Sequence, residues 1–375
     1  MNEKKHELEI AYDKAINKIE RNSARIQTSF PHVAIGLHGQ YNNEKPYFWT
    51  SGFWTGLLNL AYRETNNEKL TVLIQENEDN LNLCFNEFIH LHHDVGFMFI
   101  PSTLYTYLTT NNEESRVRTL KAASLLASRY NPNGKFIRAW NEEVRENSKG
   151  LAIIDCMMNL PLLYWASKES TDPRFRHIAV NHTNTVLTSF LREDGTVPHI
   201  IEFDAETGET LGPIQGQGRG PDSRWSRGQS WALYGFAIGY RETGNDAYLE
   251  AAMYIADTYY ALLPENKIPY WDFDSDEKDQ WVTDSSSAAI AASGMLELSL
   301  ISQDRAVSSR YKEMGIDILT HLTEEYADFS DTTEGILLGG TVSYPNRKHV
   351  NVPIIYGDFY YIEALGKLKG LKGFF

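Results

Sequence analysis

The sequence has little cysteine and no long apolar run. Its two cysteines, Cys84 and Cys156, both lie among apolar neighbours, so we expect reduced thiols in the core rather than a disulfide framework. No apolar stretch reaches the roughly 18 residues of a membrane-spanning helix. Residues 1–22 are charged throughout and lack the apolar centre of a secretory signal. These absences predict a cytoplasmic protein that does not enter a membrane.

Positive charge is also scarce. Lys and Arg number 35 against 50 Asp and Glu, which gives a net charge of -15 at pH 7. An acidic chain of this kind is not expected to bind nucleic acid or an anionic membrane as its main partner. An anionic ligand would therefore need a locally basic pocket.

Amphipathic segments recur along the chain. Apolar residues are repeated in them at intervals of three and four, as on a helix with one buried face, and Asn, Asp or Ser stands where each can cap a helix. Five such segments begin at Thr65, Thr110, Ser170, Thr243 and Ser302, and residues 5–28 supply a sixth. We expect six helices that expose one side to water.

A second kind of segment alternates with the first and is apolar nearly all round. These segments begin at Gly52, Asp94, Ile153, Arg227, Ser285 and Gly357. Helices that are apolar all round are buried ones. Six outer and six inner helices in alternation predict an all-α fold, an (α/α)6 barrel that forms a single domain over residues 1–375.

The longer connections precede the inner helices. They span residues 131–150, 191–226 and 264–284, and they leave the same end of the barrel because every outer-to-inner connection has the same polarity. Two strand-like stretches, residues 195–204 and 339–346, predict short β-hairpins at that end. Functional residues are concentrated on such loops and on the helix starts beneath them.

Two aspartates stand at the starts of successive inner helices. Asp94 and Asp155 are 61 residues apart, one helical hairpin, so we expect both to face the same mouth. Each could simply cap its helix. The apolar neighbours of Asp155 favour the protonated form of a carboxyl group, which suits a general acid, and Asn159 could hydrogen-bond it. Two carboxylates in unlike environments are typical of active sites in which one acts as the acid and the other as the base.

The stretch "HLHHD" allows a metal-binding interpretation. His90, His92, His93 and Asp94 are all residue types that bind metals, but no second group of His, Cys or acidic residues completes the set. Histidines at a helix start are commonly hydrogen-bonded scaffolding. We therefore expect no metal and no cofactor.

Aromatic residues are frequent near the expected mouth. The flat C–H faces of sugar rings stack on such side chains, so the aromatic residues favour a saccharide ligand. They are Trp49, Trp54, Trp140, Trp225, Trp231, Tyr270 and Trp271. Trp54 and Trp231 lie inside helical patterns and could instead pack the barrel.

Three arginines gather beside two of these tryptophans. Arg219, Arg224 and Arg227 lie in "GRGPDSRWSRGQSW", and a guanidinium next to a cleft can hold a carboxylate or a sulfate by paired hydrogen bonds. Arg219 and Arg224 could equally be solvated loop charges. Arg227, at the start of an inner helix, is the strongest candidate.

Six motifs in order resemble one enzyme family. They are "WTSGFWTG" (49–56), "HHDVGF" (92–97), "IIDCMMNLPLL" (153–163), "WSRGQSWALYGF" (225–236), "DSSSAAIAASGMLEL" (284–298) and "YGDFYYIEAL" (356–365). Over residues 30–368 the chain resembles the unsaturated glucuronyl hydrolases, glycoside hydrolase family 88. The resemblance implies a catalytic barrel that acts on lyase-generated glycosaminoglycan oligosaccharides of the chondroitin, hyaluronan or heparin type, as a monomer or homodimer.

The resemblance also implies a mechanism. Such an enzyme removes a 4,5-unsaturated uronic acid from the non-reducing end by hydrating the vinyl ether, and not by displacement at the anomeric carbon. Asp155 would protonate C4 and then accept a proton from the water that adds at C5. The hemiketal formed opens and breaks the glycosidic link. Asp94 would hold ring hydroxyls and support the charge of the transition state, with no metal.

Further positions are implied to contact the substrate. They are Trp49, Trp140, His199, Gln217, Trp225, Arg227 and Trp231, with Pro213 and Gln215 on a loop beside them. Streptococcal relatives grip a sulfate with a Ser-x-x-Ser-x-Lys pattern, which "SYPNRK" resembles at Ser343 and Lys348. Asn346 replaces the second serine and can still donate a hydrogen bond, so sulfate acceptance is expected.

Two alternatives stay open at this level. The unsaturated rhamnogalacturonyl hydrolases share the barrel and would act on pectin fragments. A non-catalytic sugar-binding barrel would use both aspartates only as helix caps and ligands.

Overall fold

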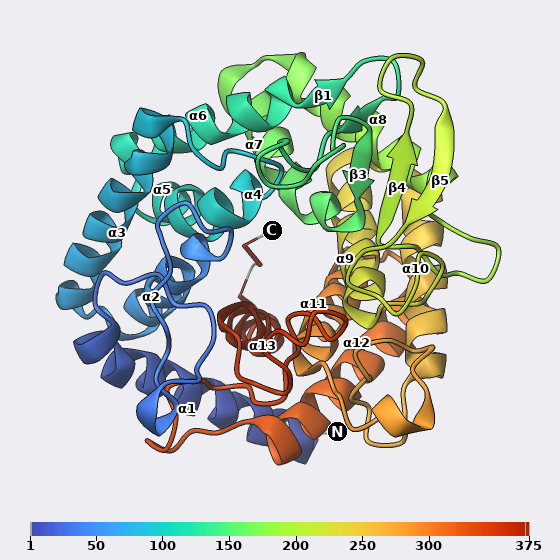
Figure 1. The fold of residues 1–375 in the computed structure, drawn as a ribbon. Coiled ribbons are helices and arrows are strands. Elements are labelled where there is room, and N and C mark those ends of the chain that lie inside the picture. The colour runs from blue at the N-terminus through green and yellow to red at the C-terminus, as the bar shows by residue number, and fades with distance from the viewer. Residues whose placement is uncertain (1, 372, 375) are drawn as a thin grey trace.

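The structure is a computed structural model that describes residues 2–371, 373 and 374, and two concentric layers of helices dominate it (Figure 1). The outer helices are α1 (Asn2–Ile26), α3 (Glu68–Glu87), α6 (Glu113–Ser128), α8 (Pro173–Ser189), α10 (Asp246–Leu262) and α12 (Arg305–His321). The inner layer consists of α2 (Ser51–Thr65), α4 (Val95–Phe99) with η2 (Ile100–Leu104) and α5 (Tyr105–Thr110), η3 (Ile154–Asn159) with α7 (Leu160–Ser170), α9 (Ser226–Thr243), α11 (Ser285–Ile301) and α13 (Ile355–Leu368). Within the described residues, the predicted (α/α)6 barrel is confirmed.

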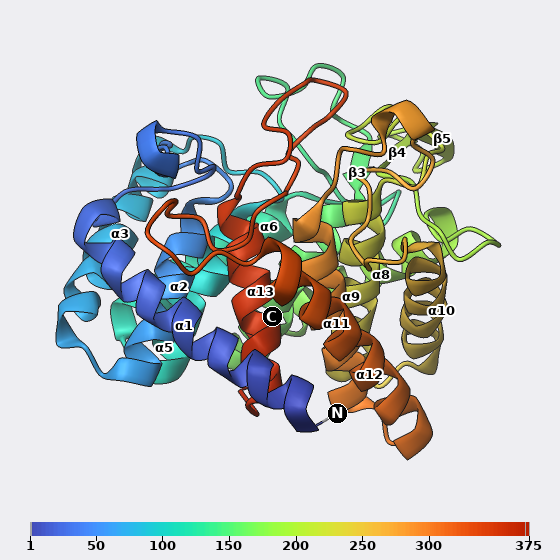
Figure 2. The same cartoon turned by 90° about the horizontal axis from the view of Figure 1, so that it is seen from below.

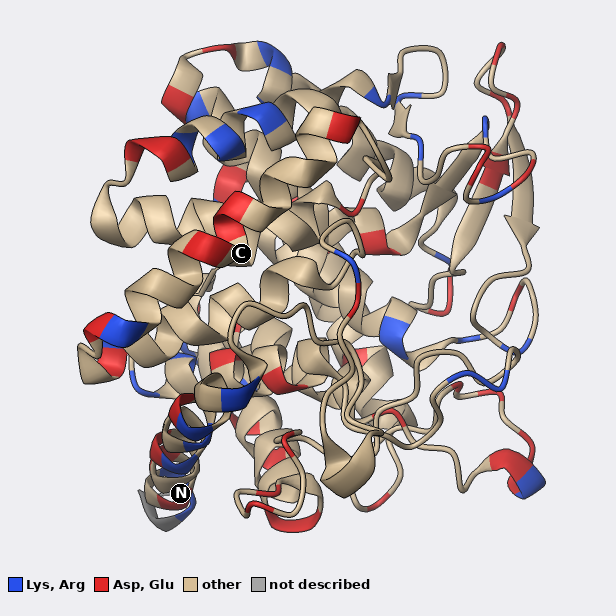
Figure 3. Cartoon of the chain, turned by 60° about the vertical axis from the view of Figure 1, so that its left-hand side comes forward, with Lys and Arg blue, Asp and Glu red and all other residues tan. Residues whose placement is uncertain are grey.

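The sequence determines which layer each helix joins. Every residue of α11 from Ser285 to Ser299 is buried, and its small side chains let it pack closely on α9. At Gly294 an added Cβ would lie 3.0 Å from the Cβ of Tyr234. The outer helices keep one wet face, and charged residues of both signs are spread over them and over the loops (Figure 3). The hydrophobic periodicity of each segment thus determines whether its helix lies in the inner or the outer layer.

Polar caps start the outer helices, as predicted. A side-chain oxygen of the N-cap residue accepts a backbone N–H at five of them, from Asn67, Asn112, Asp172, Asn245 and Asp304. Each such bond satisfies a donor that the helix itself leaves free. The capping residues therefore fix where the outer helices begin.

The second inner helix is interrupted. Pro101 has no backbone N–H, and the segment that contains it, η2, is a π-helical turn between α4 and α5. Other short segments lie in connections: η1 (Leu37–Gly39), η4 (Glu277–Asp279) and the π-turn η5 (Leu322–Tyr326). None of these short segments was expected from the sequence.

Short strands lie in the long loops at one end of the barrel, the upper end in Figure 2. The strands β1 (Tyr130–Asn131) and β2 (Phe136–Ile137) form a small hairpin. A three-stranded antiparallel sheet has the order β3 (Leu151–Ile153), β4 (Ile200–Phe203) and β5 (Thr210–Ile214). The predicted hairpin around residues 195–204 is therefore present. Ile153, expected to begin an inner helix, is instead the last residue of β3, an edge strand that leads into that helix.

The second expected hairpin is shorter than predicted. In residues 339–346 the structure has isolated antiparallel bridges, Gly340 with Val352 and Ser343 with Lys348, rather than named strands. Residues 339–344 are mostly buried, whereas Pro345 to Lys348 are exposed at the turn. This stretch forms a tight return beside the starts of the inner helices.

The core and the chain end complete the barrel. Cys84 and Cys156 are free and buried, as expected. The ring of Phe374 stacks on Tyr105 with centroids 3.7 Å apart, and its backbone N–H donates to Glu363 Oε1 at 3.0 Å. The C-terminal segment thus lies inside the ring of inner helices (Figure 1). Among the described helices, none is long and apolar enough to cross a bilayer.

Candidate active site

The starts of the inner helices bring most of the expected site residues to one end of the barrel. Asp94 precedes α4, Asp155 lies in the first turn of η3, and Trp225 and Arg227 flank the first residue of α9. The loops that carry Gln217 and residues 343–348 join them at this end (Figure 2). Both aspartates therefore occupy the positions that the repeat pattern predicted.

The three-stranded sheet places His199 beside Asp155. Ile153 pairs with Ile200 in the antiparallel register, and one step further Ile154 N–H donates to the carbonyl of His199 at 3.0 Å. Asp155 follows at once, and its Oδ2 lies 3.3 Å from Nε2 of His199. The strand register, and not a helix cap, thus determines the neighbour of this carboxylate.

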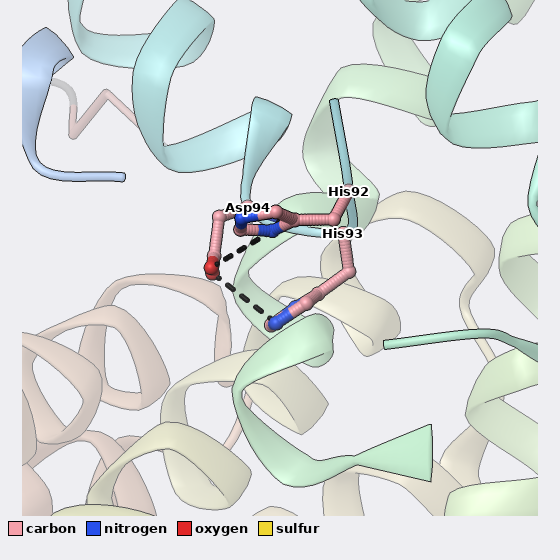
Figure 4. Close-up of side chains that lie close together, drawn as sticks. All are labelled: His92, His93 and Asp94. Atoms are coloured by element: carbon pink, nitrogen blue, oxygen red, sulfur yellow. Dashed lines mark hydrogen bonds and ion pairs between the residues drawn. The ribbon is translucent and has the colours of Figure 1, made fainter. Parts of the chain in front are cut away.

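Asp94 is a buried carboxylate between two imidazoles (Figure 4). Its oxygens lie 3.2 Å from His92 Nδ1 and 3.4 Å from His93 Nε2. Although Asp94 is the N-cap residue of α4, its side chain makes no capping hydrogen bond, so the capping interpretation is wrong for its carboxylate. Burial raises the pKa of Asp94, but His93, His92 and Arg129 outweigh burial and hold it below the usual value.

His93 responds in the opposite direction. Burial lowers the pKa of His93 to about 4 and outweighs the attraction of Asp94. The two groups thus act on each other: His93 lowers the pKa of Asp94, and Asp94 limits the fall in the pKa of His93. The two aspartates differ in partners as the sequence predicted.

Asn159 connects the two helix starts. Its Oδ1 accepts the backbone N–H of Phe97, in α4, at 2.7 Å, and its Nδ2 donates to the main-chain carbonyl of Asp155 at 3.4 Å. Gly96 makes room for this contact, because an added Cβ would lie 2.3 Å from Asn159 Oδ1. The expectation that Asn159 bonds the Asp155 carboxyl is wrong; it fixes the backbones that carry the two aspartates.

The same cluster is the candidate metal site. One ligand atom each from His92, His93 and Asp94 lies within 4.8 Å of the others, and all three residues are buried. Among the described residues the group comprises these three, whereas a structural zinc site takes four protein ligands. The two imidazole nitrogens lie 3.2 Å and 3.4 Å from the Asp94 oxygens, so the three residues are partners of one another. His90 is not part of it and stacks on Tyr47 instead.

The tryptophans divide into two groups. Trp49 and Trp140 are half-buried at the mouth, and Trp225 lies under His199 with ring centroids 4.2 Å apart. Trp231 is 0 % exposed and packs on Phe97 and Tyr360, so the barrel-packing alternative describes it, and substrate contact would require its neighbours to move. Trp54 is buried as well and belongs to the core.

Arg227 is not a free guanidinium. It is 3 % exposed, and it donates to Asp284, to the carbonyls of Thr341 and Val342, and to Gln217 Oε1 at 2.7 Å. The expectation that it offers a paired set of donors to a ligand carboxylate is therefore wrong for the observed arrangement. Its charge is paired, and it holds Gln217 and a loop in place.

The other two arginines are loop charges with partners. Arg219 pairs with Asp276 and Arg224 with Asp274, and both pairs are at least partly exposed. The solvated-charge alternative therefore describes these two arginines.

The loops contribute the remaining expected positions. Ser343 and Lys348 face each other across a backbone bridge, and Asn346 Nδ2 donates to Ser343 Oγ at 3.0 Å, so the three lie together. Pro213 pairs with Ile201 in the sheet, where its main chain is structural. Gln215 uses its amide to donate to the carbonyls of Gly216 and Gly218.

Sequence reasoning missed three residues of this region. Asp284 is the buried partner of Arg227, Tyr356 lies beside Trp49 with ring centroids 5.0 Å apart, and His32 lies against Trp49 and His349. Asp284 and Tyr356 stand at inner-helix starts, which is the signal that could have found them. His32 lies in a connection and carries no such signal.

Comparison with known proteins gives a consistent family. The model of the family described as Glycosyl Hydrolase Family 88 matches residues 19–297. An unsaturated chondroitin disaccharide hydrolase of Streptococcus pyogenes is 34% identical over 361 residues, which cover 95% of this chain and 89% of that protein.

Two solved structures are similar over nearly the whole chain. The unsaturated glucuronyl hydrolase of Bacillus sp. GL1, described as responsible for the degradation of glycosaminoglycan, has a TM-score of 0.91 at 32% identity, with 96% of both chains covered. A variant of the Streptococcus agalactiae unsaturated glucuronyl hydrolase, in complex with dGlcA-GalNAc6S, has a TM-score of 0.85 at 30% identity and covers 99% of this chain and 94% of that one.

Proposed function

The chain belongs to glycoside hydrolase family 88, and on that premise we propose that it releases the 4,5-unsaturated uronic acid from lyase-generated glycosaminoglycan oligosaccharides. The bond that it breaks joins this sugar, at the non-reducing end, to the next one. The observation that carries the proposal is the pair of aspartates at neighbouring inner-helix starts, each with a different set of partners.

Asp155 is the proposed acid of this reaction. Its carboxyl proton goes to C4 of the double bond, which leaves positive charge on C5 and the ring oxygen. A water molecule adds at C5 and gives its proton to the Asp155 carboxylate, so the acid is regenerated. The resulting hemiketal opens and expels the rest of the oligosaccharide. The contact with His199 and the burial of the site support this role.

Asp94 is the proposed electrostatic partner. A carboxylate held ionised by its neighbours stabilises positive charge that develops at C5 and the ring oxygen, and it also accepts hydrogen bonds from ring hydroxyls. Asn159 supports these two roles, since it links the backbones that carry Asp94 and Asp155 and so fixes the positions of the two carboxylates relative to each other.

The substrate class follows from the relatives and the loop of residues 343–348. The Streptococcus pyogenes relative is a chondroitin disaccharide hydrolase, and the Streptococcus agalactiae relative holds a disaccharide with a sulfated amino sugar. The juxtaposition of Ser343, Asn346 and Lys348 supports a place for such a sulfate. We propose Trp49 and Trp140 as stacking surfaces and His199 and Gln217 as polar contacts. Trp225 is 2 % exposed and packs on His199 and Arg227, so we propose that it supports these two side chains.

The setting of the enzyme is part of the proposal. We propose a single catalytic domain over residues 1–375 that acts as a monomer or homodimer in the cytoplasm without nucleic acid. The buried free thiols of Cys84 and Cys156 support a reducing compartment, and the net charge of -15 supports a small saccharide as partner.

The test follows the conjugated double bond by its ultraviolet absorbance. Wild-type protein mixed with an unsaturated chondroitin disaccharide should remove this absorbance, and Asp155→Asn should lower kcat by at least about 100-fold, the usual contribution of a general acid. Asp304→Asn, at an outer-helix cap, is the matched control and should retain full activity. Normal turnover by Asp155→Asn would refute the mechanism, and preference for an unsaturated galacturonyl-rhamnose disaccharide would refute the substrate class.

A further inference from the structure

His199 receives a hydrogen bond that fixes where its proton lies. The backbone N–H of Gln217 donates to Nδ1 of His199 at 2.8 Å. An imidazole nitrogen that accepts a hydrogen bond has no proton of its own, so the proton of the neutral ring is on Nε2. The donor that determines the tautomer is a main-chain N–H, so it cannot rotate away as a side-chain donor could.

Gly216 makes this contact possible. An added Cβ at this position would lie 2.0 Å from Nδ1 and 2.7 Å from Cγ of His199. The backbone there is not in the left-handed region, so glycine is required for space and not for conformation. Trp225 contacts the same imidazole from its own helix start. The ring is thus held between fixed groups.

The loop around Gly216 is itself held. Gln215 donates to the carbonyls of Gly216 and Gly218, the Arg219 N–H donates to Asp272 Oδ2 at 2.9 Å, and the Gln217 side chain accepts from Arg227. The strand pairing of Ile214 with Ile200 brings this loop back over His199. Both partners of the hydrogen bond are therefore anchored to the same sheet.

The opposite nitrogen of the ring faces the proposed acid. Nε2 of His199 and Oδ2 of Asp155 lie 3.3 Å apart. Both atoms are buried, and at 3.3 Å they lie within reach of each other without the alignment of a hydrogen bond. Catalytic hydrogen bonds commonly align only when substrate binds. The carbonyl oxygen of a protonated carboxyl group is a better acceptor than its hydroxyl oxygen, so an N–H that donates to Oδ2 favours the catalytic proton on Oδ1.

We infer that Gly216 and the Gln217 N–H are positioning groups that lock His199 as an Nε2–H donor to Oδ2 and so leave the transferable proton of Asp155 on Oδ1. This inference rests on the proposed function and deepens it. The proton passes from Oδ1 to C4, and the carboxylate receives a proton back from the water that adds at C5. His199 keeps its own proton throughout and is neither the acid nor the base.

The tautomer can be measured without any substrate. Histidine-selective ¹⁵N labelling and NMR distinguish protonated from unprotonated ring nitrogens, and the His199 signals are assigned by their loss in His199→Gln. The inference predicts a protonated Nε2 and an unprotonated Nδ1 at neutral pH. A protonated Nδ1, alone or together with Nε2, would overturn it. Because this readout needs no turnover, it stands apart from any failure of the proposed function.

Kinetics test the consequence for Asp155. His199→Gln keeps an amide N–H at the distance of Nε2, whereas His199→Asn is too short, so His199→Gln should retain at least about tenfold more kcat. Gly216→Ala displaces the ring and should lower kcat by about tenfold or more. Gly220→Ala is the matched control in the same loop, because a Cβ there meets nothing within 4 Å. Equal kcat for Gly216→Ala and Gly220→Ala, or a more active His199→Asn, would overturn the inference.

Discussion

Arg227 and Asp284 show how a single residue can be misjudged from its position alone. Arg227 lies at an inner-helix start next to two tryptophans, which favours a ligand contact. In the structure its donors are satisfied by Asp284, by two carbonyls and by Gln217. Gln217 is ten residues away, but Asp284 and the two carbonyls lie far away in sequence, at the start of α11 and in the loop that follows η5. No local pattern contains that information, although the helix-start rule does locate both residues.

The ion pair leads to a stability prediction. Asp284→Ala leaves the buried guanidinium of Arg227 without its counter-charge, so we expect the free energy of unfolding to fall by about 3–5 kcal/mol. Asp276→Ala breaks the exposed pair with Arg219 and should cost less than about 1 kcal/mol. Urea denaturation of the two variants checks the difference. Equal losses would show that the Asp284 pair is not desolvated as the structure indicates.

At the scale of elements, hydrophobic periodicity and caps located the helices of both layers, because each helix buries a face whose width is encoded locally. Elements that depend on partners distant in sequence were not found. β3 has three residues and becomes a strand only by pairing with β4, and the π-turn at Pro101 arises within a continuous apolar pattern. The family resemblance predicted that His199 lies near the site, but the orientation of its side chain depends on the pairing of β3 with β4.

The contact between α8 and β2 predicts acid sensitivity. Nδ1 of His182, in α8, accepts the Ile137 N–H of β2 at 3.1 Å, and burial lowers the pKa of His182 to about 3. An unfolded histidine titrates near 6.5. Between these values the unfolded state binds the extra proton, so stability falls as pH falls from about 6.5, by roughly 1.4 kcal/mol per pH unit for this residue.

Substitution isolates this contribution. His182→Gln should flatten the pH dependence of the free energy of unfolding by about that amount per pH unit between pH 6 and pH 4, as measured by urea denaturation. His177→Gln, on the same helix, is the control. An unchanged slope in His182→Gln would show that this buried histidine does not set the acid response.

At the scale of the whole molecule, an acidic protein must bind an anionic sugar. The net charge of -15 opposes the approach of an anionic substrate. Binding therefore depends strongly on any unpaired cation close to the site. Arg227 is neutralised by Asp284, and Arg219 and Arg224 have acidic partners of their own. Lys348, exposed on the loop that carries Ser343 and Asn346, has no acidic partner within ion-pair distance among the described residues.

Lys348 is therefore expected to distinguish sulfated from unsulfated substrates. Lys348→Ala should raise KM for a sulfated unsaturated chondroitin disaccharide by about tenfold, the worth of one charge-assisted hydrogen bond, and should change KM for the unsulfated disaccharide much less. Steady-state kinetics on the two substrates check this. Arg347→Ala, the neighbouring cation whose guanidinium lies over Tyr344, is the control, and an equal effect of both variants on both substrates would contradict a specific sulfate contact.

We propose that the reaction begins with proton transfer from Asp155 to C4 on one face of the sugar. Running the reaction in D₂O and examining the released uronic acid by NMR tests this step. A positioned acid delivers its deuteron to a single face, so we expect one deuterium at C4 in a single configuration when the product is examined before the C5 ketone of the opened sugar exchanges its C4 hydrogens with solvent. Release of a sugar that retains its C4=C5 bond, or deuterium at C4 in both configurations, would contradict it.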